Sequence, residues 1–225
     1  MSSEGSSATQ PESSSGLPPA VRAQILATEH WSLLGTRSMT WSEVMSRIAI
    51  HLTVASASLV VLALVAQSSG FGTPFRVLSI GLASVVLVLG TLTDLRVTNA
   101  SQDDAAMIVG MNRLRAAYVA MDPTIADYLV ASWHDDQAGI MGTYTLGIAR
   151  PVVSHVVAST SFFMHAVNTI VAGTLGALIA NASGAGPAMI AVIGSATGVI
   201  FFAAIADFSR RTFTRLPIPP RFPTG

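Results

Sequence analysis

Three long stretches of the chain, residues 48–75, 77–93 and 151–206, contain no aspartate, glutamate or arginine. A helix needs about 20 apolar residues to cross the hydrocarbon core of a bilayer, so the third stretch is long enough for two spans. The pattern predicts four transmembrane helices, at about 46–67, 75–94, 153–180 and 188–207. The expected fold class is therefore an all-α integral membrane protein.

The polar segments divide the rest of the chain. Residues 1–19 are rich in serine, proline and glycine, which predicts a disordered tail. Residues 20–38 are expected to form a cytoplasmic or interfacial helix, with Trp31 at the headgroups and Gly35 as its stop. The sequence from Thr40 to Glu43 has the form of a capping box, which predicts a new helix start for the first membrane hairpin, residues 40–94.

Residues 95–150 are expected to form a cytoplasmic helical segment between the two hairpins. Asp103 and Asp104 favour a helix start there, because negative charge is stabilised at a helix N-terminus. Asp122 followed by Pro123 indicates the end of that helix and the start of another. The second hairpin is expected over residues 151–207, followed by a basic, proline-rich tail over 208–225.

Composition and charge agree with a membrane location. Mean hydropathy is +0.58 and the net charge is zero, which gives no reason to expect a nucleic-acid partner. There is no cysteine, which excludes disulfides and thiolate metal sites, and no cofactor-binding or catalytic motif stands in the sequence. The basic residues are all arginine, a bias that points to GC-rich coding and a bacterial source.

The arginines set the expected orientation. All twelve but Arg76 lie before or at the start of the first span, between the second and third, or after the fourth. By the positive-inside rule, both termini and the middle segment are expected in the cytoplasm, and the protein in the cell inner (plasma) membrane. The residues expected to anchor this arrangement are Arg47, Arg150, Arg210 and Arg211.

The two hairpins show a weak internal similarity. Pro74, Gly81 and Asp94 align with Pro187, Gly194 and Asp207 at a constant offset, which places a loop proline, a packing glycine and a terminal aspartate at matching depths. A 2+2 duplication would explain these matches, and so would chance similarity between apolar helices. Duplicated hairpins of the same orientation would be related by an axis along the membrane normal.

The third span carries the main candidate site. Ser161, His165 and Asn168 follow one another at i, i+4 and i+7 and form a polar intramembrane face. One hypothesis makes this face a proton-accessible lining with His165 as its titratable member. The competing hypothesis makes it a set of hydrogen bonds between helices. His51 and His155 are expected nearer the membrane surface, where water satisfies them.

Other patterns add packing and contact candidates. Gly194 and Gly198 have the GxxxG spacing that lets helix backbones approach, and Gly81 is expected to pack similarly; the sequence leaves the partner helix open. The cluster from Trp133 to Asp136 could hold a metal ion or cap a helix. Helix capping is favoured, because consecutive helical residues point in different directions and cannot easily converge on one ion. The C-terminal tail could anchor to anionic lipid or act as a proline-motif ligand.

These features lead to one leading hypothesis and two alternatives. The leading one is a scaffold or accessory subunit of the inner membrane, with the lipid bilayer and a second copy or another membrane protein as partners. The alternative is a small channel or transporter that uses the polar face of the third span. A membrane-embedded enzyme is the weaker alternative, because no catalytic constellation supports it.

Overall fold

The computed structural model describes residues 16–148, 151, 154, 157–213 and 218–224 as a helical assembly, and this described part contains no strand. Four of its helices, α1 (Pro19–Ser69), α2 (Thr73–Met121), α5 (Thr160–Ala182) and α6 (Pro187–Phe213), are long and apolar enough to cross a membrane. Their length and composition indicate a membrane protein. The expectations for residues 1–15, Arg150 and His155 concern positions outside the described residues.

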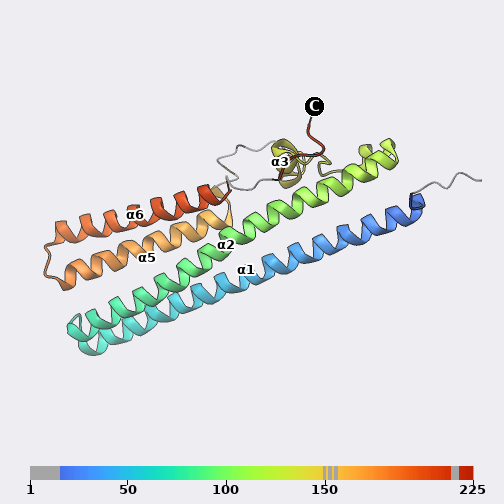
Figure 1. The fold of residues 1–225 in the computed structure, drawn as a ribbon. Coiled ribbons are helices and arrows are strands. Elements are labelled where there is room, and N and C mark those ends of the chain that lie inside the picture. Colours follow the sequence, from blue (N-terminus) through green and yellow to red (C-terminus); the bar gives the residue numbers. More distant parts are fainter. Residues whose placement is uncertain (1–15, 149–150, 152–153, 155–156, 214–217, 225) are drawn as a thin grey trace, which may run out of the picture.

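The helices lie in a row rather than in a closed bundle. Figure 1 shows the order α1, α2, α5, α6 across the molecule, with α2 between α1 and α5 and with α6 packed on the far side of α5. The turns at 70–72 and 183–186 lie at the same end, which we call the loop end. We call the opposite end of the four-helix segment the charged end, because Glu43, Arg47, Arg96, Asp207 and Arg210 lie there.

α1 and α2 are about twice as long as the other two helices, with 51 and 49 residues. At about 1.5 Å per residue each exceeds 70 Å, more than twice the hydrocarbon thickness of a bilayer. Both therefore extend beyond the charged end, and we call this paired part, residues 19–42 and 97–121, the extension (Figure 1). The turn between them contains Gly70 with φ of 67°, a left-handed conformation that glycine adopts without strain.

The continuity of α1 differs from the expected break between residues 38 and 40. Gly35 stays inside the helix, because one interior glycine costs only about 1 kcal/mol and α1 gains packing against α2 on both sides of it. Glu43 does not cap a helix start; its carboxylate binds Arg47 and Arg96 instead. Asp103 and Asp104 likewise lie in the middle of α2 rather than at a helix start.

Two short helices cover the extension. η1 (Pro123–Tyr128) begins as predicted, since Asp122 ends α2 and its side chain accepts a hydrogen bond from the Thr124 amide at 3.0 Å. α3 (Gln137–Thr145) is capped by Asp136, whose side chain accepts from the Gly139 amide at 2.8 Å. Ser159 caps α5 in the same way, accepting from the Phe162 amide at 3.2 Å.

The α5–α6 contact brings two helix backbones close together. A methyl group on Gly194 would lie 3.0 Å from the Gly173 carbonyl oxygen and 3.0 Å from Cβ of Ala177. Gly198 faces Gly173 and the Thr169 carbonyl in the same contact. The partner of the GxxxG pair, which the sequence left open, is thus α5. Gly81 differs from the expectation, because a methyl group there would meet no atom within 4 Å.

Candidate functional site

The centre of the site is the carboxylate of Asp94, which has no exposed surface. α2 places it opposite α5, where Nδ1 of His165 lies 2.7 Å from Oδ1 and the Asn168 amide donates to Oδ2 at 3.3 Å. Within the described part of the chain these two side chains are its hydrogen-bonding partners, and no arginine contacts it. The two groups therefore form a buried carboxylate–histidine pair between α2 and α5.

His51 of α1 reaches the same face of α2, one turn from Asp94. It is 1% exposed, and neither of its ring nitrogens has a hydrogen-bond partner among the described residues. Its ring lies against Gly90 of α2, and so does the side-chain oxygen of Asn168. The absence of a side chain at Gly90 is what brings the histidine of α1 and the asparagine of α5 together across α2.

Further unsatisfied polar atoms follow the face of α2 that carries Asp94. Gly90, Asp94 and Thr98 are spaced by four residues and share this face. The Thr98 hydroxyl and the Asn168 carbonyl oxygen are both buried without a hydrogen-bond partner in the described structure. Buried polar groups are nearly always hydrogen-bonded in proteins, so these two oxygens have hydrogen-bonding capacity that the described side chains leave unused.

A cavity of about 1020 Å³ near the charged end reaches His165, the partner of Asp94. Its walls come from α1, α2, α3, α5 and α6. Six of its lining residues carry hydroxyl groups on serine or threonine, and the imidazole of His165 also lines it. Nδ1 of His165 thus contacts the Asp94 carboxylate, while the same imidazole ring borders the cavity. Ser161 lines the cavity as well, and its hydroxyl lies 3.4 Å from that of Ser101 on α2.

The predicted polar face of α5 therefore divides into two parts. Ser161 and His165 border the cavity, whereas Asn168 lies in a closed contact with α2. Towards the loop end the same face continues with the buried small residues Ala172, Gly176 and Ala180. Ser161 and His165 are accordingly reached from the cavity, whereas Asp94 and Asn168 are enclosed by helix packing.

A second buried carboxylate, Asp104, lies in the extension. Arg37 Nε and Trp41 Nε1 donate to one oxygen at 2.6 and 2.8 Å, and the Tyr144 hydroxyl donates to the other at 2.7 Å. Burial, together with the hydrogen bond to the Asp104 carboxylate, raises the pKa of Tyr144 well above its ordinary value. The hydroxyl therefore stays protonated at neutral pH, and the three donors join α1, α2 and α3.

Three of the four expected anchoring arginines are among the described residues, and they lie at or outside the charged end. Arg47 binds Glu43 at 2.8 Å, and Arg210 and Arg211 bind Asp207 at 3.2 and 2.7 Å. The hydrogen bonds from Arg96 and Arg47 lower the pKa of Glu43, which keeps this group ionised at neutral pH. Asp207 is held in an exposed ion pair, unlike Asp94, its counterpart in the proposed repeat.

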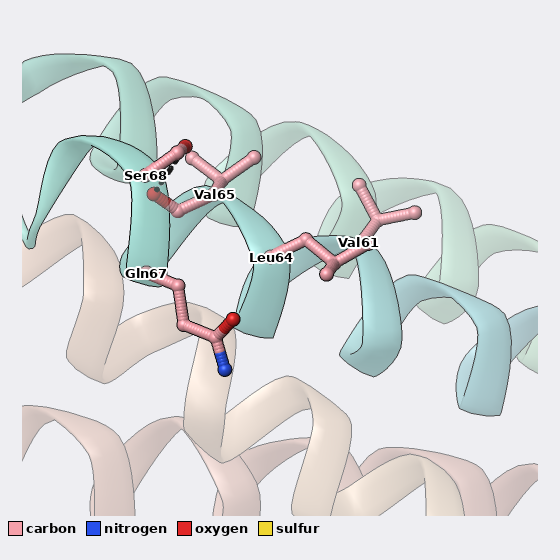
Figure 2. Close-up of a pocket in the computed structure, with 5 residues that line it drawn as sticks. All are labelled: Val61, Leu64, Val65, Gln67 and Ser68. Atoms are coloured by element: carbon pink, nitrogen blue, oxygen red, sulfur yellow. Dashed lines mark hydrogen bonds between the residues drawn. The ribbon is translucent and has the colours of Figure 1, made fainter.

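A separate depression lies near the loop end of α1. Figure 2 shows its five lining residues, Val61, Leu64, Val65, Gln67 and Ser68, all from one helix. The Ser68 hydroxyl is used in a hydrogen bond to the carbonyl of Val65 at 3.2 Å. The depression contains no titratable group, so it offers none of the chemistry of the buried cluster.

Two residues of the candidate site were missed from the sequence. From the sequence, Asp94 was expected only as the residue that ends the second span. His51 was expected near the membrane surface, with water as its hydrogen-bonding partner. The signal that could have found them is the four-residue spacing of Gly90, Asp94 and Thr98 at the end of an apolar helix, because a small residue one turn from a carboxylate leaves room for a neighbouring side chain.

Comparison with protein-family models, with curated proteins and with solved structures gives no match. The function is therefore argued from the geometry of the site.

Proposed function

We propose that this protein translocates protons across the membrane, alone or coupled to a small solute, with the Asp94–His165 pair as the proton-binding site. The observation that carries the proposal is a fully buried carboxylate whose partners are a histidine and an asparagine, with the histidine also lining a large cavity. Ionisable groups inside a membrane are costly, and proton relays in pumps and transporters use such acid and histidine pairs.

In this proposal the structure represents the state that is open to the charged end. A proton arriving through the cavity meets His165 first, because its ring borders the cavity, and it passes to Asp94 along the 2.7 Å contact. His51, buried and without a partner, is the next acceptor beyond Asn168. Release on the far side requires a second state in which the helices around α5 rearrange, since Ala172 and Gly176 are buried in helix contacts here.

The experiment measures proton uptake into proteoliposomes with a pH-sensitive dye, for wild type, Asp94→Asn and Asp103→Asn. Asparagine keeps the shape of the side chain but cannot bind the proton, so uptake through Asp94→Asn should fall by about 100-fold or more, as when a positioned proton-transfer group is removed. Asp103 lies on the same helix with an exposed side chain, and its variant should keep wild-type uptake. Wild-type uptake by Asp94→Asn would refute the proposal.

The orientation and the membrane belong to the proposal as well. We place the charged end, the extension and both termini in the cytoplasm of a bacterial cell with the protein in its inner membrane. Support comes from the arginine distribution and from the extension, which is longer than the headgroup layer is thick and therefore projects into water. The cavity would then admit protons from the cytoplasm.

The duplication remains part of the proposal. Both hairpins have a short turn followed by a helix with proline in its first turn, at Pro74 and Pro187, which supports a common origin. In this view the two aspartates diverged, since Asp94 became a buried site residue and Asp207 an exposed partner of arginines.

A scaffold role is the second candidate, favoured by large apolar side chains on the α1 part of the extension. Trp31 and Met39 are each 75% exposed, and Ile25 is also exposed. Lipid would not cover these residues if the extension projects from the membrane, whereas a second copy of the chain would.

Self-association through the extension can be tested separately from transport. The variant Trp31→Ser with Met39→Ser should reduce the apparent mass of the detergent-solubilised protein in light scattering if these side chains lie in an interface. The pair His165→Ala with Asn168→Ala should leave that mass unchanged while it abolishes proton uptake. An unchanged mass for the Trp31 and Met39 variant would argue against association through this surface.

A further inference from the structure

The cluster from Trp133 to Asp136 binds the C-terminal segment of the chain. The carboxylate of Asp135 accepts hydrogen bonds from the backbone amides of Arg221 at 2.9 Å and Phe222 at 2.7 Å. The Asp135 amide in turn donates to the Phe222 carbonyl at 3.2 Å, so the two segments pair through their backbones. The cluster thus uses its carboxylates to hold a peptide rather than to converge on a metal ion.

The neighbouring side chains extend this contact in both directions. Asp136 accepts from the Thr224 amide at 2.7 Å and from the Thr224 hydroxyl. Arg113 of α2 donates to Asp135 at 2.7 Å and to the Pro219 carbonyl at 2.8 Å. The contact therefore covers residues 219–224 and engages mainly their backbone groups, as expected for recognition of an extended proline-containing segment.

Both carboxylates are ionised when the segment is bound. Burial raises the pKa of Asp135, but the amides of Arg221 and Phe222 and the guanidinium of Arg113 outweigh it and lower the pKa overall. The hydrogen bonds from Thr224 and Gly139 lower the pKa of Asp136 to about 2. Because both values are depressed, the ionised carboxylates favour binding at neutral pH, and this contribution is lost only as the pH falls below about 4 towards 2.

The bound segment connects two walls of the cavity. Ile140, Met141 and Tyr144 of α3 form part of the lining just after the cluster, and Ser209 and Arg210 line it near the end of α6. From residue 213 to residue 218 the chain can span at most about 18 Å. Residues 219–224 bind Asp135 and Asp136, which immediately precede α3, and the short connection therefore keeps the end of α6 close to α3.

We propose that residues 133–136 are a binding surface for an extended, proline-rich C-terminal segment, and that the chain's own residues 219–224 act there as a latch that restricts access to the cavity. The inference stands apart from proton translocation, because it concerns the width of the cavity entrance and not what passes through it. Release of the segment would free α6 to move away from α3 and widen the entrance.

The absence of cysteine in the chain allows a direct test in detergent solution. A single cysteine at Ser161→Cys lies in the cavity wall, and its reaction rate with a water-soluble thiol reagent reports access. Asp135→Ala with Asp136→Ala should make labelling several-fold faster, whereas Asp127→Ala, an exposed carboxylate in η1, should leave the rate unchanged. A cysteine at Ser69→Cys, outside the cavity, should react at the same rate in every background.

Asp136 also caps α3, so a second variant separates the latch from the folding of α3. A chain ending at residue 213 keeps the cap intact and should label as fast as the double variant. A synthetic peptide of residues 218–225, added in trans, should bind this chain and restore slow labelling, and a peptide of scrambled sequence should not. Equal labelling rates with and without the segment, or failure of the peptide to bind, would overturn the proposal.

Discussion

Gly90→Ala is expected to destabilise the protein strongly, although it adds a single methyl group. That methyl carbon would lie 2.0 Å from Oδ1 of Asn168 and 2.8 Å from Cε1 of His51. Both side chains are buried, and Asn168 cannot turn away without giving up its hydrogen bond to Asp94. We expect a loss of about 2–3 kcal/mol, the upper part of the range for overpacking a core.

Gly81→Ala is the matched control on the same helix, because a methyl group there meets nothing within 4 Å. Alanine should be neutral there or stabilise α2 by up to about 1 kcal/mol, since glycine is the weaker helix former. Thermal unfolding of the detergent-solubilised variants, followed by tryptophan fluorescence, measures both. A similar shift for the two variants would mean that α1, α2 and α5 do not converge at Gly90.

The second large effect is expected from Asp104→Ala. The substitution leaves the Arg37 guanidinium, the Trp41 indole and the Tyr144 hydroxyl without their shared acceptor. Breaking a buried charged network in this way costs about 3 kcal/mol or more, which we reduce to about 2–3 kcal/mol because the Arg37 side chain is partly exposed and can turn to water. Asp104→Asn should lose less, since its amide oxygen still accepts one of these bonds.

The neighbouring carboxylate provides the control for this prediction. Asp103 has an exposed side chain and a single 3.7 Å contact with Arg96, so Asp103→Ala should change the stability by less than about 0.5 kcal/mol. The same fluorescence-monitored unfolding compares the adjacent positions. Near-equal effects at 103 and 104 would contradict the network that joins α1, α2 and α3.

The four spans were predictable because the membrane constrains the sequence directly. Every residue facing hydrocarbon must be apolar, so the charge-free stretches alone indicate helices able to cross a membrane, and the structure has four such helices. The ends of the helices were less predictable. Gly35 and the capping-box sequence are local signals for a break in α1, yet packing against α2 extends the helix through both.

The candidate site was only half predictable, for a related reason. The spacing of His165 and Asn168 indicates a polar face on one helix, and this periodicity is a local property. What the face meets depends on which helix lies opposite and at what height. Asp94 is separated from His165 by 71 positions in the chain, and only the packing of α2 against α5 brings the two within 2.7 Å.

The sequence by itself determined that four apolar helices form, that the arginines other than Arg76 lie on one side of them, and that α5 carries a polar stripe. The tertiary structure alone decided that the helices lie in a row, that Gly90 admits His51 and Asn168 to the surroundings of Asp94, and that the C-terminal segment binds Asp135 and Asp136. The physical reason is that hydrophobicity acts on each residue separately, whereas hydrogen bonds and close contacts require partners that the fold brings together from distant parts of the chain.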